Sequence, residues 1–163
     1  FRYLLSRKFC VDVRNVHGYI IGEHGDTQLP LWSVTNIAGK NINEYFNDPV
    51  YRITEEEKAA IVHDVKTAGA EIIKKKGATY YAIAAAVNNI LESILKDQNT
   101  IRTVSSVING VYGIEDVALS LPSKVNSQGI KEIINLKLSD EELTALKYSA
   151  EQLKKVLSEL KNI

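Results

Sequence analysis

The sequence contains no methionine, one cysteine and three prolines, and it has no long run of apolar residues. The single cysteine, Cys10, cannot form an internal disulfide bond, which argues against a disulfide-rich secreted protein and predicts a reducing, cytoplasmic location. No segment approaches the run of about 18 apolar residues that a membrane-spanning helix needs. A complete translation product begins with methionine, whereas this sequence begins with Phe1, so we predict that it is a piece of a longer protein.

An excess of charge of one sign is also missing. The 20 lysines and arginines balance the 20 aspartates and glutamates, so the formal net charge is zero. This balance argues against nucleic acid as a partner and against a basic membrane anchor. No Gly-x-Gly-x-x-Gly loop follows a predicted strand, so any Rossmann half would have to lie outside this sequence. The length of 163 residues suits one domain, residues 1–163.

Hydrophobic spacing divides the chain into helical and strand-like segments and predicts an α+β fold, with mixed or antiparallel strands packed with long helices. Thr54 and Ser139 each begin a capping box, which marks the start of a helix, and Gly77 is expected to kink or end the first long helix. The predicted helices cover residues 1–9, 54–77, 78–95 and 139–163. The predicted strands cover residues 16–22, 31–37, 104–112, 116–121 and 130–138.

The polar loop of residues 22–27 carries the strongest candidate for chemistry, His24, at the end of a predicted strand. Loops on rigid scaffolds often hold reactive groups, and an imidazole exchanges protons near neutral pH. Gly22 and Gly25 would let a substrate approach the backbone closely, and Glu23 and Asp26 could tune the charge of His24. The alternative interpretation is a solvated polar turn with a structural histidine.

A metal site is a second alternative, since His17, Glu23, His24 and Asp26 are all potential ligands. The sequence has no His-x-x-x-His and no paired cysteines, so we predict no metal. His63 is expected to lie on a helix surface.

Other residues with distinctive chemistry receive structural interpretations. Tyr80 and Tyr81 lie far in sequence from Trp32 and Phe46, and basic residues do not cluster around them, so core packing is favoured over base stacking. Cys10 has no neighbouring histidine or second cysteine and is predicted to be a buried thiol.

Residues 17–33, HGYIIGEHGDTQLPLWS, closely resemble the L-lactate dehydrogenases, the bacterial ones in particular. The resemblance continues in order through residues 77–83, 111–114, 119–122 and 139–163. It implies the C-terminal, substrate-binding domain of the lactate/malate dehydrogenase fold, without the Rossmann half that binds most of the NAD. The implied parent protein is an NAD-dependent enzyme that interconverts pyruvate and L-lactate.

The same resemblance assigns roles to single residues. It implies that His24 is the catalytic proton donor and acceptor, that Thr79 lines the substrate pocket, and that Ile83 packs near the nicotinamide ring. The alternative for Thr79 is an N-cap of the following helix, and the alternative for Ile83 is ordinary core packing.

Arg2 and His17 match the positions at which many bacterial members bind fructose 1,6-bisphosphate as an allosteric effector. An arginine and a protonated histidine suit a phosphate group, and two-fold symmetry would double the site. The alternatives are surface charge for Arg2 and a strand-edge histidine for His17. The resemblance also implies a homotetramer for the full-length enzyme.

Two other functions stay open. The first is malate dehydrogenase of the same superfamily, because the residue that selects lactate over malate lies outside this sequence. The second is a non-catalytic assembly module. The family's Leu-Asp-x-x-Arg segment, which orients the histidine and binds the substrate carboxylate, would end just before Phe1, so we expect the chain alone to be inactive.

Overall fold

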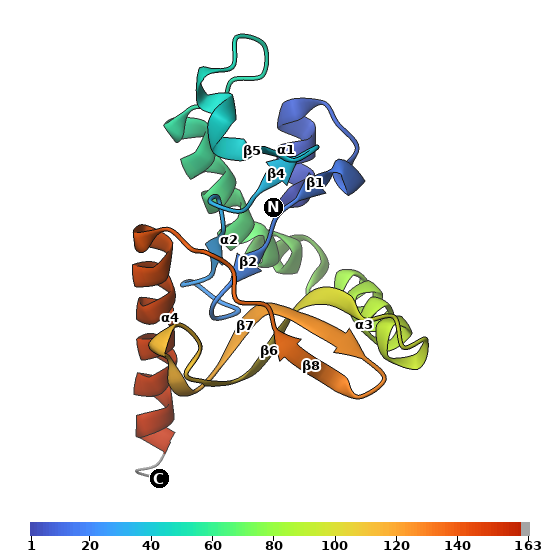
Figure 1. Ribbon diagram of the computed structural model, residues 1–163, viewed down its shortest axis with the longest axis vertical. Coiled ribbons are helices and arrows are strands. Elements are labelled where there is room, and N and C mark those ends of the chain that lie inside the picture. The colour runs from blue at the N-terminus through green and yellow to red at the C-terminus, as the bar shows by residue number, and fades with distance from the viewer. Residues whose placement is uncertain (161–163) are drawn as a thin grey trace.

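The computed structural model describes residues 1–160, apart from the side chain of Asn47, and the predicted helix residues 161–163 lie outside this part. Figure 1 shows an upper lobe that contains the N-terminus and a lower lobe built around a twisted sheet, with α2 running between them. The elements in chain order are α1 (Arg2–Phe9), η1 (Val13–Asn15), β1 (Val16–His17), β2 (Ile20–Ile21), β3 (Leu29–Pro30), β4 (Asn36–Ile37), β5 (Lys40–Asn41), η2 (Ile42–Asn47), α2 (Glu55–Lys76), α3 (Tyr81–Leu95), β6 (Thr100–Asn109), η3 (Val111–Gly113), β7 (Glu115–Asn126), β8 (Gly129–Ile133) and α4 (Asp140–Leu160).

Every strand pairing in the described part is antiparallel, which confirms the predicted α+β class. The largest sheet has the order β6-β7-β8. A smaller sheet has the order β1-β4-β5, with β4 in the middle, and β2 pairs with β3. The long β6–β7 hairpin turns through η3, where Gly110 has a φ of 87°, a left-handed value that favours glycine. α4 and α3 lie on either side of the β6-β7-β8 sheet in Figure 1, and both contact β7.

Each lobe has its own hydrophobic cluster. The upper cluster joins α1 to the β1-β4-β5 sheet and to the start of α2, through Leu5, Phe9, Val16, Ile37, Ile42, Ile53 and Ile61. The lower cluster joins the β2–β3 hairpin to β7 and α4, through Ile21, Leu31, Ile108, Ile114, Val117, Leu119, Leu121, Leu146 and Ala150. The β2–β3 hairpin therefore belongs to the lower core, although its neighbours in sequence belong to the upper one.

The two long helices begin where the capping boxes predict. The Thr54 hydroxyl accepts from the Glu57 amide, and the Glu57 carboxylate accepts from the Thr54 amide. Ser139 and Glu142 exchange the same two hydrogen bonds at the start of α4. Lys8 of α1 donates to Glu57 and lowers the pKa of its carboxyl group, so the cap of α2 is also joined to α1.

Three of the predicted strands are corrected, the third being that of residues 130–138, because β8 ends at Ile133. Residues 16–22 form two short strands in different sheets, and residues 31–37 contain a turn before β4. The chain changes partners at Gly18, where an added Cβ would lie 2.9 Å from Thr35 Oγ1, so the backbone approaches Thr35 too closely for a continuous strand with side chains. Gly77, with a φ of 80°, ends α2 completely, and α3 begins four residues later as a separate helix.

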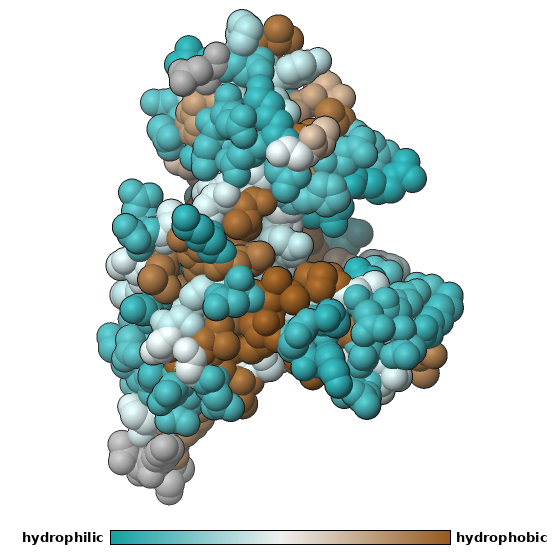
Figure 2. Space-filling model, in the orientation of Figure 1, coloured by the Kyte–Doolittle hydropathy of each residue, from teal (hydrophilic) through white to brown (hydrophobic). Residues whose placement is uncertain are grey.

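The burial of α2 and α3 was predicted wrongly. The apolar stripe of α2 is buried at Ile61 but exposed at Ile72, and α3 is exposed along most of its length. Tyr80 and Tyr81, predicted to pack in the core, are 52% and 74% exposed. No element of the described part covers this face, and Figure 2 shows further apolar surface near the centre of the molecule. The apolar faces of α2 and α3 are therefore not fully buried by the described residues of this chain.

Two smaller predictions also have outcomes. Cys10 is exposed and not buried, because it is the left-handed residue that ends α1, with a φ of 53°. His63 is exposed on α2, as predicted. None of the helices in residues 1–160 is long and apolar enough to cross a membrane.

Substitutions on the large sheet test how much the lower hydrophobic cluster contributes to the stability of the chain. Leu119 on β7 is fully buried, so Leu119→Ala should lower the free energy of unfolding by about 2–5 kcal/mol, through lost burial and the cavity left behind. Val107 on β6 is 63% exposed, and Val107→Ala should change the free energy of unfolding by less than about 0.5 kcal/mol. Urea denaturation followed by circular dichroism measures both. Equal effects would contradict the assignment of the core.

Candidate active-site loop

His24 lies on the loop between β2 and β3, residues 22–28, which we call the His24 loop. The loop starts from a fixed base, because Gly22 pairs with Ser120 of β7 through two backbone hydrogen bonds of 3.0 and 2.9 Å. Within the hairpin, Ile21 lies opposite Leu29 and is buried in the lower core. These contacts hold the polar loop against the sheet while its tip stays in solvent.

The His24 side chain is exposed and makes no hydrogen bond or ion pair with any residue of the described chain. It lines a pocket of about 270 Å³ with residues of β2, of the loop itself, of β6 and of β7, namely Ile20, Ile21, Gly22, Glu23, Gln28, Thr103 and Ser120. Both ring nitrogens are therefore available to a bound molecule. An imidazole in this setting can donate or accept a proton near neutral pH.

Glu23 does not face His24 as a charge partner. Its carboxylate accepts a hydrogen bond from Thr27, and its backbone amide donates to Ser149 of α4 at 2.8 Å. The Thr27 and Ser149 hydroxyl oxygens are themselves 2.9 Å apart. The acidic neighbour of His24 thus ties the loop to α4, and the predicted charge tuning by Glu23 has no contact to support it.

The two glycines of the loop serve the packing of the protein itself. An added Cβ at Gly22 would lie 2.9 Å from Ser149 Oγ, and Gly22 has a φ of 91°. An added Cβ at Gly25 would lie 2.7 Å from a Glu23 carboxylate oxygen. The sequence interpretation placed a substrate in this space, whereas in the structure the Ser149 and Glu23 side chains occupy it.

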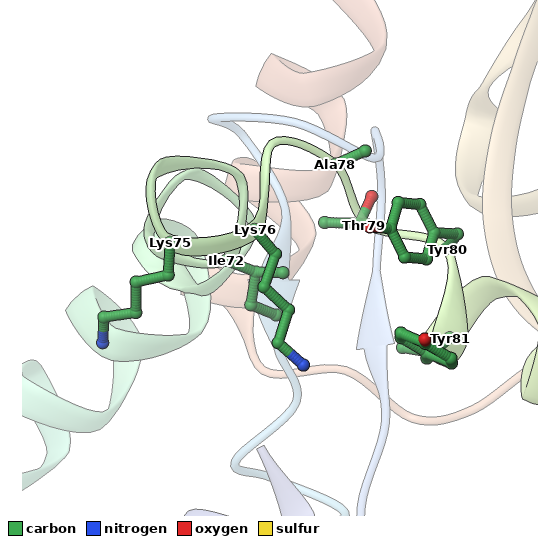
Figure 3. A pocket seen from close by; sticks show the side chains of 8 residues that line it. Ile72, Lys75, Lys76, Ala78, Thr79, Tyr80 and Tyr81 are labelled. Atoms are coloured by element: carbon green, nitrogen blue, oxygen red, sulfur yellow. The ribbon is translucent and has the colours of Figure 1, made fainter.

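Thr79 lies in the connection between α2 and α3 and is half-buried. It lines a second pocket, of about 240 Å³, with Ile72, Lys75, Lys76, Ala78, Tyr80, Tyr81 and Ala82. Figure 3 shows these side chains, with Lys76 extending toward Tyr81, whose ring centroid is 5.4 Å from the ammonium nitrogen. His24 and Thr79 therefore line different pockets in the described chain, and the structure does not bring them into one.

The structural alternatives for Thr79 and Ile83 are wrong. The N-cap position of α3 is Tyr80, which makes no side-chain cap, so Thr79 is not the cap. Ile83 is 55% exposed in the first turn of α3, so it is not a core residue. Both residues instead lie at the exposed face near the start of α3, which no element of residues 1–160 covers.

Arg2 and His17 are close in the fold. The Arg2 guanidinium donates to the carbonyl oxygens of Val16, at 2.7 Å, and Val13, at 3.0 Å. His17 follows Val16 on β1 and is exposed. Since a guanidinium has five N–H donors, Arg2 keeps several for an external anion while its orientation is fixed by the backbone.

Arg102 is a cation that the sequence interpretation missed. It lines a pocket of about 470 Å³ with Arg2, at the junction of α1 with β6, and its Nε donates to Ser93 Oγ at 3.3 Å. A single arginine just before the predicted strand of residues 104–112 gives no sequence signal for this. No group of three or more histidine, cysteine or acidic side chains in residues 1–160 could hold a metal, so the proposed His17, Glu23, His24 and Asp26 set is not assembled.

Comparisons with known proteins match the whole length of this chain to one protein family. A family model described as lactate/malate dehydrogenase, alpha/beta C-terminal domain, matches residues 1–163. The chain belongs to this family. The predicted resemblance and the predicted fold class are therefore confirmed.

The relatives of this dehydrogenase domain are longer proteins. L-lactate dehydrogenase 1 of Clostridium acetobutylicum is 50% identical over 160 residues, which are 98% of this chain and 51% of the relative. The solved L-lactate dehydrogenase of Clostridium thermocellum superimposes with a TM-score of 0.86 and 64% identity, over 98% of this chain and 52% of the other. The minor L-lactate dehydrogenase of Enterococcus mundtii superimposes with a TM-score of 0.91 and 39% identity, over 96% of this chain and 50% of the other. The chain spans about half the length of the relatives it matches.

A comparison of two glycines tests the packing of the His24 loop. Gly39 has a φ of 81° and nothing within 4 Å of an added Cβ, so Gly39→Ala isolates the left-handed strain of about 1–2 kcal/mol. Gly22→Ala should lower the free energy of unfolding by clearly more, because its Cβ also displaces Ser149. Urea denaturation measures the difference, and equal losses would contradict the close contact.

Proposed function

We propose that this chain is the substrate-binding and catalytic-histidine half of an NAD-dependent L-lactate dehydrogenase. The observation that carries the proposal is His24, an exposed imidazole that has no hydrogen-bond partner among the described residues 1–160, on a loop fixed to β7 and α4. The family model matches all of this chain, residues 1–163. The names of the relatives that match at about 50% identity favour lactate over malate as the substrate.

The chemistry of His24 follows from its exposure. In its charged form the imidazole donates a hydrogen bond to the keto oxygen of pyruvate and then transfers its proton as that oxygen gains negative charge. In the reverse direction the neutral imidazole takes the proton from the hydroxyl group of L-lactate. A partner-free ring suits both directions, since no hydrogen bond within the chain has to break.

The residues of this chain fit a nicotinamide ring only in part. Ile83 offers an exposed apolar side chain in the first turn of α3, and Thr79 offers a hydroxyl group four residues before it. A bound NADH supplies the hydride for the reaction. Thr79 and Ile83 are proposed to contact the substrate and the nicotinamide respectively, and most of the dinucleotide would be bound by residues outside this chain, which has no glycine-rich phosphate loop.

The His24 assignment is tested in the whole enzyme that contains this chain. His24→Gln should lower kcat for pyruvate reduction by about 10²- to 10⁴-fold, because the amide cannot supply a proton. His63→Gln, on the exposed surface of α2, is the matched control and should keep the rate. The measurement is NADH oxidation followed by absorbance.

Other outcomes separate the alternatives. Full activity of His24→Gln would remove the histidine from the mechanism. A preference for oxaloacetate over pyruvate would identify a malate dehydrogenase, and no turnover of either substrate would favour an assembly module. The 163-residue chain alone should be inactive. Turnover by it would contradict the proposal that residues outside this chain are needed to bind most of the dinucleotide.

We also propose that Arg2 and His17 bind fructose 1,6-bisphosphate in a cytoplasmic homotetramer. The support is their proximity across the Arg2–Val16 hydrogen bond and the donors that Arg2 keeps free for an anion. A phosphate group bound by a guanidinium and a protonated imidazole gains two charge-assisted hydrogen bonds.

The effector site has its own test. In the whole enzyme, His17→Ala should remove most of the activation by fructose 1,6-bisphosphate and weaken its binding in titration calorimetry. His63→Ala is the control. Unchanged activation in His17→Ala would reject this role.

A further inference from the structure

Three side chains next to His24 form a closed ring of hydrogen bonds. The Glu23 amide donates to Ser149 Oγ at 2.8 Å, Ser149 Oγ and Thr27 Oγ1 are 2.9 Å apart, and Thr27 donates to the Glu23 carboxylate. Each hydroxyl group has one proton. Since the Thr27 proton points to the carboxylate, the proton between the two hydroxyl groups belongs to Ser149. The ring therefore runs from the Glu23 amide to Ser149, to Thr27 and back to Glu23.

The ring is placed where it is protected from water. Ser149 is completely buried on α4, and Glu23 and Thr27 are half-buried. Hydrogen bonds that point in one direction around a ring polarise one another, and a carboxylate acceptor strengthens the bond that it receives. A buried hydroxyl group that lost its partners would be left unsatisfied, so each member holds the others in place.

α4 gives the ring a rigid support. Further along the hairpin, Glu142 of α4 accepts hydrogen bonds from both the amide and the hydroxyl group of Ser33, which follows β3. The helix is thus joined to the residue directly before His24 through Glu23, and to the chain after the loop through Ser33. The loop is held at both sides by one helix, while the His24 ring itself stays free.

We propose that Ser149 and Thr27 are positioning residues, which fix the backbone on either side of His24 so that its imidazole meets the substrate in one orientation. Neither side chain touches the reacting atoms. This inference rests on the proposed function for its catalytic consequence, but the fixing of the loop is a property of the chain alone. Displacement of a catalytic group by about 1 Å can lower a rate by on the order of 100-fold, so such a support has a measurable effect.

Hydrogen exchange tests the support without any activity. In the chain of residues 1–163, Ser149→Ala should speed exchange of the Glu23 amide by about tenfold or more, because the amide loses its buried acceptor. Ser123→Ala is the matched control: Ser123 is also completely buried, and within residues 1–160 its hydroxyl group bonds only to the Leu121 carbonyl on β7. It should leave Glu23 exchange unchanged. Equal exchange in Ser149→Ala and the unsubstituted chain would overturn the inference.

Kinetics of the whole enzyme test the catalytic consequence. Thr27→Val removes the hydroxyl group at constant size and should lower kcat for pyruvate by about 10- to 100-fold, with KM for NADH unchanged. Thr27→Ser keeps the hydroxyl group and should restore most of kcat, which a role in packing alone would not predict. A Thr27→Ser variant as slow as Thr27→Val, or Thr27→Val with normal kcat, would overturn the positioning role.

The two proposals fail in different ways. If the unsubstituted enzyme does not reduce pyruvate, the proposed function fails, and the exchange of the Glu23 amide alone decides whether Ser149 fixes the loop. If the enzyme is active and His24→Gln is inactive, but Thr27→Val keeps its kcat, then the function stands and the positioning role is wrong.

Discussion

The attachment of one short hairpin to β7 and α4 organises the part of this chain that carries its candidate chemistry. β2 has only two residues, yet Gly22 at its end forms two backbone hydrogen bonds with Ser120, and the next residue donates its amide to Ser149. Because Ile21 is buried immediately before these contacts, apolar burial and hydrogen bonding fix the same three residues. His24 is the first residue beyond them whose side chain reaches solvent.

The same contacts explain why glycine stands where it does. At Gly22 the left-handed backbone and the nearby Ser149 both exclude a side chain, whereas at Gly25 the exclusion comes only from the Glu23 carboxylate folded back beneath the loop. A glycine motif read from sequence does not distinguish room for a substrate from room for the protein's own side chains. Here the Ser149 and Glu23 side chains occupy the space beside the two glycines, so the glycines serve the packing of the loop that carries His24.

Local rules account for what the sequence predicted well. Both capping boxes, the end of α2 at Gly77 and the exposed turn at His24 depend on residues within a few positions of one another, and all are present in the structure. The split of residues 16–22 between two sheets and the ring through Ser149 depend on partners more than 100 residues away or on a change of strand partner. Periodicity carries no information about such pairings, and Arg102 was missed for the same reason.

The wrong predictions of burial share one cause, and it bears on function. Periodicity indicates that a face of a helix is apolar, but it does not indicate whether the same chain covers that face. α3 shows the limit of that assumption, since Tyr81 and Ile83 belong to its apolar surface and are more than half exposed. The chain spans about half the length of its relatives, and the pocket of Thr79 lies on this open face while the pocket of His24 does not. The hydrogen bonds that fix the backbone of the His24 loop lie within residues 1–160, whereas the pocket of Thr79 lies on a face that these residues leave open. This difference makes the His24 loop the part of the site whose geometry can be tested in isolation.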